Sequence, residues 1–237
     1  DIAGIDLDSL NRPDCAKVLK VAADRFPELC SVVLRDHQVD PPTLALINRL
    51  PLLRMLAINA EGLTSAQVLG LKRLSCLEVF EIANYKGDMS ELLDRLYSMQ
   101  LRVLVLQNVR LKEADLSNLK RAYNLQRLAL DHVGMRREWL KNLLVLNHLA
   151  YLDLLNDGEN INWVEPLKPF ERLQELVVRD NNASVEERKK LHDSLKRALK
   201  VQGRANNCNV RTSRDAEIGG YGNHAGEAAD IGIMISP

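Results

Sequence analysis

One hydrophobic pattern returns along this chain at a constant interval, and it constrains the fold more than any other feature. The pattern is L-x-x-L-x-L, with Ile, Val or Phe in some of the leucine positions. Its copies begin at equal steps, at Leu29, Leu53, Leu77, Leu101, Leu125, Leu149 and Leu173. A weaker copy, Ile2-Ile5-Leu7, begins 27 residues before the first. Such self-similarity indicates stacked 24-residue units that bury their apolar surface against their neighbours.

The alternation inside each copy predicts a β-strand. Successive side chains of a strand point to opposite faces, so positions four and six of each repeat should point inward and positions three, five and seven outward. Because the register returns with every 24-residue repeat, the strands are expected to stack in parallel, with neighbours about 4.8 Å apart.

The second half of each repeat predicts a helix. Apolar residues stand at the fifteenth place after the anchor, as at Leu44 and Leu140, and again at the eighteenth, as at Ile47 and Leu143. This i, i+3 spacing is the inward stripe of an amphipathic helix. Arg95 interrupts the second column of apolar residues, and the neighbouring Leu96 can supply the apolar side chain in its place. Helices are wider than strands, so strands should line the concave face of a curved molecule and helices the convex face.

The strand half of all seven repeats resembles the leucine-rich-repeat superfamily, over residues 1 to about 200. The resemblance implies an α/β solenoid that binds other proteins. The position that usually holds a ladder asparagine departs from the family pattern, although Asn84, Asn108 and Asn156 occur one residue earlier. Helical units without clustered cap cysteines look more like intracellular members, such as F-box substrate receptors or nucleotide-binding immune receptors.

The chain divides into four parts. Residues 1–28 form an N-terminal capping repeat and residues 29–183 the leucine-rich repeats. Residues 184–214 form a basic capping helix, which Ser184 and Glu187 open with a capping box, and a possible closing strand around Cys208 and Val210. Residues 215–237 are a Gly/Ala-rich tail. Because the chain starts at Asp1, we expect it to be part of a larger chain or complex.

Charge and cysteine usage narrow the function classes. Lys and Arg number 32, as do Asp and Glu, so the whole molecule has no general attraction for nucleic acid or anionic membranes. No apolar run reaches the roughly 18 residues of a membrane helix. The four cysteines are far apart in sequence, which favours a reducing, intracellular (cytoplasmic or nuclear) location.

The outward strand positions supply the candidate partner-binding site. Val79, Val103 and Val105, with Met55, should form an exposed apolar patch, and such a patch with a charged rim often marks a binding surface. Alternatively, β-branched residues occur there because they suit strands. The predicted site residues are Met55, Val79, Val103, Val105, Arg127, Asp131, Tyr151, Asp153, Leu155 and Arg179. Tyr151 is the best hot-spot candidate, and Val103→Asp with Tyr151→Ala should abolish binding with little change in melting temperature.

No catalytic or metal-binding pattern accompanies this surface. The five histidines lack metal-ligand spacing, and no phosphate-binding glycine loop is present. We therefore expect a non-enzymatic scaffold or adaptor without cofactor or metal, whose partner is a protein. The alternatives are nucleic-acid binding by the basic C-terminal helix, a substrate-receptor subunit of a ubiquitin ligase, and regulation of a GTPase by the rim.

Overall fold

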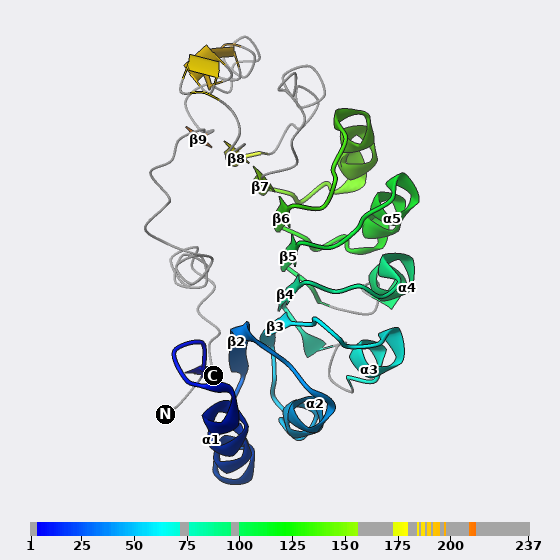
Figure 1. Ribbon diagram of the computed structural model, residues 1–237. Coiled ribbons are helices and arrows are strands. Elements are labelled where there is room, and N and C mark those ends of the chain that lie inside the picture. Colours follow the sequence, from blue (N-terminus) through cyan, green and yellow to red (C-terminus); the bar gives the residue numbers. More distant parts are fainter. Residues whose placement is uncertain are drawn as a thin grey trace.

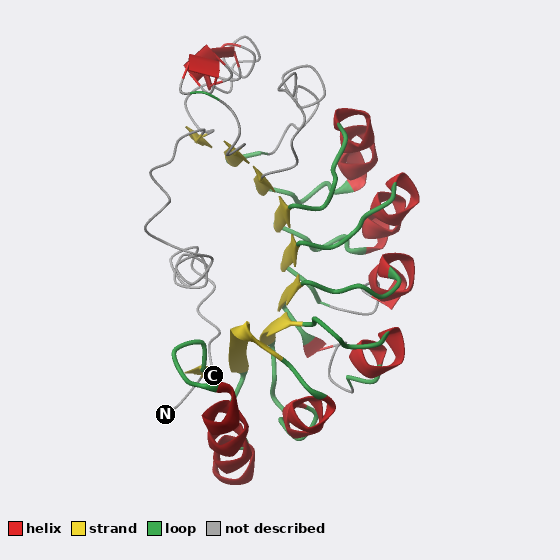
Figure 2. Cartoon of the chain, viewed as in Figure 1, coloured by secondary structure: helices red, strands yellow, loops and turns green. Residues whose placement is uncertain are grey.

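The repeats form a curved sheet with helices along its outer side. The computed structural model describes residues 4–71, 76–95, 100–155 and 173–179, several residues between 184 and 197, and residues 209–211. Within these residues nine parallel strands form one sheet in chain order, from β1 to β9. Figure 1 shows the strands along the inside of an arc with the helices outside it, and Figure 2 marks the two classes by colour. The predicted α/β solenoid, with strands concave and helices convex, is confirmed.

Each strand is short, and along the chain the helices alternate with the strands. The strands are β1 (Gly4–Asp6), β2 (Ser31–Gln38), β3 (Met55–Asn59), β4 (Val79–Ala83), β5 (Val103–Gln107), β6 (Arg127–Asp131), β7 (Tyr151–Leu155), β8 (Glu175–Arg179) and β9 (Asn209–Arg211). The helices are α1 (Arg12–Arg25), α2 (Pro41–Ile47), α3 (Ser65–Leu69), α4 (Met89–Arg95), α5 (Glu113–Asn118) and the 3-10 helices η3 (Leu119–Arg121) and η4 (Arg137–Val145).

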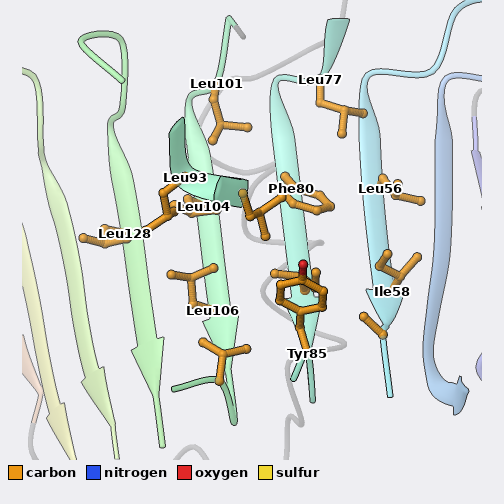
Figure 3. Close-up of a cluster of buried hydrophobic side chains, with 14 of the residues drawn as sticks. Leu56, Ile58, Leu77, Phe80, Tyr85, Leu93, Leu101, Leu104, Leu106 and Leu128 are labelled. Carbon is orange, nitrogen blue, oxygen red and sulfur yellow. The ribbon is translucent and has the colours of Figure 1, made fainter. Parts of the chain in front are cut away.

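The strand register follows the 24-residue spacing. From β3 to β8, each strand residue pairs with the equivalent residue of the next repeat, as Leu56 does with Phe80 and Phe80 with Leu104. The side chains at position four are buried in every repeat: Val32, Leu56, Phe80, Leu104, Leu128, Leu152 and Leu176. Figure 3 shows several of them packed in layers with the leucines of neighbouring repeats. Burying each such side chain contributes about 1.5–3 kcal/mol.

The helical columns also face the core, but two segments differ from the expected α-helix, namely η3, which follows α5 directly, and the longer η4. Leu44, Leu140, Ile47 and Leu143 are buried, as predicted. Residues Arg137–Val145, however, form the 3-10 helix η4. A 3-10 helix has three residues per turn, so an i, i+3 spacing gives one buried face in either helix type.

Two further details complete the helical half. Arg95 is exposed, as its charge requires, whereas Leu96 lies outside the described residues. In α4 the buried side chains are Met89, Leu92 and Leu93, which pack toward the core in place of a leucine at position 95.

A short asparagine ladder follows the strands, one residue earlier than in the family pattern. Asn84, Asn108 and His132 have φ values of 57°, 49° and 51°, in the left-handed region that asparagine tolerates better than most residues. Asn108 Nδ2 donates to Asn84 Oδ1 at 2.5 Å, and Asn84 Nδ2 donates to Asn59 Oδ1 at 3.1 Å. The next position holds a buried Tyr85, whose hydroxyl donates to Ser65. The ladder is therefore shifted, and in three repeats the usual asparagine position carries a core side chain, Tyr85, Val109 or Val133.

The ends of the sheet contain the expected features where they are described. The Glu187 backbone N–H donates to Ser184 Oγ at 3.2 Å, and the Ser184 N–H donates to Glu187 Oε2 at 2.7 Å, so the predicted capping box is present. Strand β9 pairs in parallel with β8, where the sequence indicated a closing strand. The tail, residues 215–237, lies outside the described residues.

Candidate functional site on the concave face

The predicted site residues lie on six neighbouring strands, on the face of the sheet that points away from the helices. We call the outward positions three, five and seven of the strands the concave face. Met55 belongs to β3, Val79 to β4, Val103 and Val105 to β5, Arg127 and Asp131 to β6, Tyr151, Asp153 and Leu155 to β7, and Arg179 to β8. The register brings Met55, Val79, Val103, Arg127 and Tyr151 into one row across the sheet. The side chain of Arg179 lies outside the described part of the structure.

The centre of this face is an apolar cluster, separate from the main core. Val79, Val103, Val105 and Ala129 pack together, and the half-buried Met55 contacts them. We call this group the apolar cluster. The sequence predicted an exposed patch, and this was wrong, because the exposed fractions of Val79, Val103 and Val105 are only 6%, 5% and 7%. Each side chain lies between in-register neighbours on both adjacent strands, and the curvature of the sheet crowds the side chains on its inner face.

The burial of Val103 also overturns the predicted behaviour of the Val103→Asp and Tyr151→Ala pair. An aspartate at position 103 would place a charge between Val79 and Arg127, at a buried site. Burying a charge without full compensation is costly. We therefore expect Val103→Asp to destabilise the fold, so Tyr151, which is half-buried, is the better position for a binding test.

A buried ion pair borders the apolar cluster on its C-terminal side. Arg127 Nη2 donates to Asp153 Oδ2 at 2.7 Å, and the two side chains are only 8% and 4% exposed. The other carboxylate oxygen of Asp153, Oδ1, is buried and has no hydrogen-bond partner within the described residues. The neighbouring Asp131 accepts a hydrogen bond from Gln107 Nε2 at 3.1 Å and contacts His132 Nδ1 at 2.8 Å. Of the predicted charged rim, Arg127, Asp131 and Asp153 are therefore buried in a polar network, which the sequence did not predict.

A second ion pair, which the sequence interpretation missed, borders the cluster on its N-terminal side. Arg35 Nε donates to Glu81 Oε1 at 2.8 Å, and Arg35 Nη1 lies 3.5 Å from Asp8 Oδ2. Arg35 stands on β2 and Glu81 on β4, so the guanidinium reaches across β3, where the small Ala57 occupies the same column as Glu81. Both residues occupy outward positions, and the alanine between them was the available signal.

The remaining predicted residues have less to contribute. Leu155, at the end of β7, is buried to about the same degree as the valines of the apolar cluster. Tyr151 is half-buried, and its hydroxyl donates to Gln174 Oε1 at 3.3 Å. Tyr151 thus presents the largest partly open side chain among the described residues of the predicted site.

The described residues carry no sign of a metal site or a membrane span. They contain no group of three or more His, Cys, Asp or Glu side chains placed to hold a metal ion. No helix in the described part of the chain is both long and apolar enough to cross a membrane. Cys15, Cys30 and Cys76 are present as thiols and not as disulfides.

No family model matches the chain, and no curated protein matches it significantly. Among solved structures, the chain is similar to a leucine-rich-repeat protein from Leptospira interrogans, with 14% sequence identity and a TM-score of 0.39. The match covers 78% of this chain, and it spans 55% of the length of that protein. The fold assignment therefore rests on the register and the buried columns described above.

Proposed function

We propose that this chain is a non-enzymatic interaction module that binds a segment of a partner protein across its concave face. The observation that carries the proposal is the layout of that face, where an apolar cluster lies between two ion-pair networks and the described helices lie on the opposite side. Solenoid curvature creates extended concave surfaces, and repeat proteins use these to bind their partners.

The proposed setting is intracellular, within a larger chain or complex. The three described cysteines are thiols, which is usual for a reducing compartment. A scaffold or adaptor role, in the manner of intracellular leucine-rich-repeat proteins, requires neither cofactor nor catalytic residues. In this proposal the specificity comes from the outward strand positions, since they differ from repeat to repeat while the inward positions stay apolar.

Tyr151→Ala is the variant that tests this proposal. Cross-linking followed by affinity purification identifies proteins retained by the wild type, and each is then measured as a purified pair. A central aromatic hot spot contributes about 2 kcal/mol or more, so we expect Tyr151→Ala to weaken binding about 10-fold or more. The matched control is Tyr123→Ala, because Tyr123 is 60% exposed and lies between η3 and β6, off the concave face.

The controls also separate the alternatives. If Tyr123→Ala and Tyr151→Ala bind a purified partner as tightly as the wild type does, the concave face is not the binding surface. Binding through the basic C-terminal helix to nucleic acid would instead weaken steeply as salt is raised and would not respond to Tyr151→Ala.

A further inference from the structure

The carboxylate of Asp153 on the concave face is only half satisfied by hydrogen bonds from the described residues. It stands in the middle of β7, at position five, and its Oδ2 is held by Arg127 at 2.7 Å. Its Oδ1 is buried, and among the described residues no donor reaches it. A buried acceptor without a donor is unfavourable, and an ionised oxygen more so than a neutral one. A ligand that displaces the groups covering Oδ1 and brings an N–H donor to it would therefore form a hydrogen bond that the described residues do not supply.

The sign of the charge on this face agrees with a donor that is a cation. The outward positions from β1 to β8 carry five acids, Asp6, Glu81, Asp131, Asp153 and Glu175, against three arginines, Arg35, Arg127 and Arg179. Asp8, which lies against Arg35, adds a further negative charge. The whole chain has equal numbers of acidic and basic residues, so the negative balance is a property of this face. Such a balance attracts cationic segments and repels phosphate.

Tyr151 adds an aromatic side chain to the same face, close along the strand to Asp153. It stands two residues before Asp153 on β7, so both side chains are on the same face of the strand. The tyrosine is half-buried, so part of the residue is open to a ligand. Aromatic rings and carboxylates are the two partners that a guanidinium or ammonium group prefers.

The apolar cluster determines what the rest of the ligand must contain. Val105, Ala129 and Asp153 are register partners in one column, so Asp153 is two strand spacings from Val105, or about 10 Å. An extended peptide advances about 3.3 Å per residue. A segment that crosses the strands can thus place an apolar side chain over the valines and a basic side chain over Asp153, about three residues apart.

We propose that the concave face recognises an extended peptide segment of a partner protein in which a Lys or Arg, about three residues from an apolar side chain, binds Asp153 beside Tyr151. This inference rests on the proposed function and specifies the chemistry of the partner. The cation donates to Oδ1 of Asp153, while Arg127 keeps the other oxygen in place. The apolar side chain covers Val103 and Val105.

The test begins with a phage-displayed library of short random peptides, selected on the full wild-type chain. We expect the selected peptides to be enriched in Lys or Arg about three positions from an apolar residue. The best of them is then synthesised with a fluorescent label, together with a version in which the basic residue is replaced by glutamine. We expect this replacement to weaken binding to the wild type about 10-fold or more.

The protein variants locate the binding site. Asp153→Asn should weaken binding of the basic peptide about 10-fold. It should change binding of the glutamine version by less than about threefold, because the protein variant and the peptide replacement remove the same interaction. The matched control is Glu138→Gln, an exposed acid of η4 whose neutralisation should leave binding unchanged. If Asp153→Asn does not fold, the glutamine replacement in the peptide and the Tyr151→Ala variant still test the inference. Tyr151→Ala is expected to weaken binding of the basic peptide about 10-fold.

The possible failures are distinguishable. Peptides without basic residues that lose binding on Tyr151→Ala would overturn the cation inference and leave the concave face as a protein-binding surface. Basic peptides that bind to Asp153→Asn and to Tyr151→Ala as tightly as they bind to the wild type would refute both the inference and the proposed function. A selection that enriches no Lys- or Arg-containing peptide would also overturn the inference.

Discussion

Replacing Asn84 tests the physical basis of the turn that follows each strand. Asn84 has a φ of 57°, donates to Asn59 Oδ1 at 3.1 Å and accepts from Asn108. Alanine in the left-handed region costs roughly 1–2 kcal/mol, and each lost hydrogen bond about 0.5–1.5 kcal/mol. We therefore expect Asn84→Ala to lower the free energy of unfolding by about 2–5 kcal/mol.

A glycine variant separates the two contributions. Asn84→Gly loses the same two hydrogen bonds but adopts a positive φ without strain, although it loses about 0.5–1 kcal/mol through the greater freedom of its unfolded chain. Asn84→Ala should accordingly be less stable than Asn84→Gly by about 0.5–1 kcal/mol. The free energies are measured by urea unfolding, followed by far-UV circular dichroism of the wild type and both variants under the same conditions.

The comparison between the stabilities of Asn84→Ala and Asn84→Gly tests the contribution of backbone strain. If alanine at position 84 proves as stable as glycine, or more so, backbone strain does not explain why asparagine stands there. If neither variant differs measurably from the wild type, the side-chain ladder makes no net contribution to stability.

The remaining predictions concern the core and the thiols. Leu104→Ala should lower the free energy of unfolding by about 2–5 kcal/mol, because Leu104 is fully buried. The control Leu144→Ala, at a 38% exposed position, should lower it by less than about 1 kcal/mol. Equal losses in urea unfolding would contradict the inward assignment of position four. Burial raises the pKa of the Cys15 thiol above its ordinary 9.0, and Cys76 is exposed, so alkylation at about pH 8 should modify Cys76 long before Cys15. Because the unfolded thiol ionises first, the stability that Cys15 contributes is complete below about pH 9 and is lost as the pH rises through its folded pKa. Cys15→Ala should therefore lose less stability between about pH 8 and pH 10 than the wild type, and equal losses would count against this assignment.

Most of the strand half could be predicted from the sequence, because it follows from one repeating interval. The 24-residue spacing requires Leu56, Phe80 and Leu104 to occupy equivalent places, and a parallel sheet is the arrangement in which equivalent places become neighbours. The convex half was less predictable in detail. An i, i+3 apolar spacing specifies which side faces the core, but it is compatible with both an α-helix and the 3-10 helix η4.

The burial of the concave face could not be predicted from alternation alone. Alternation assigns Val103 to the face opposite the core, and the structure agrees. How much solvent reaches that face depends on the curvature of the sheet and on the size of the neighbouring side chains, which are properties of several repeats together. Val103 is therefore outward in register and still only 5% exposed.

The partners of the charged outward residues were even harder to predict from the sequence than the burial of the valines. Columns of outward residues can be derived from the sequence, but Arg127 pairs diagonally with Asp153, and Arg35 reaches over a whole strand to Glu81. In both cases an alanine stands beside the arginine's path, Ala129 on β6 and Ala57 on β3, and it leaves room for the long side chain. Small residues at outward positions thus decide which charges meet. A repeat protein can therefore change the binding chemistry of its concave face by exchanging one small side chain, without altering the register of leucines that holds the strands in place.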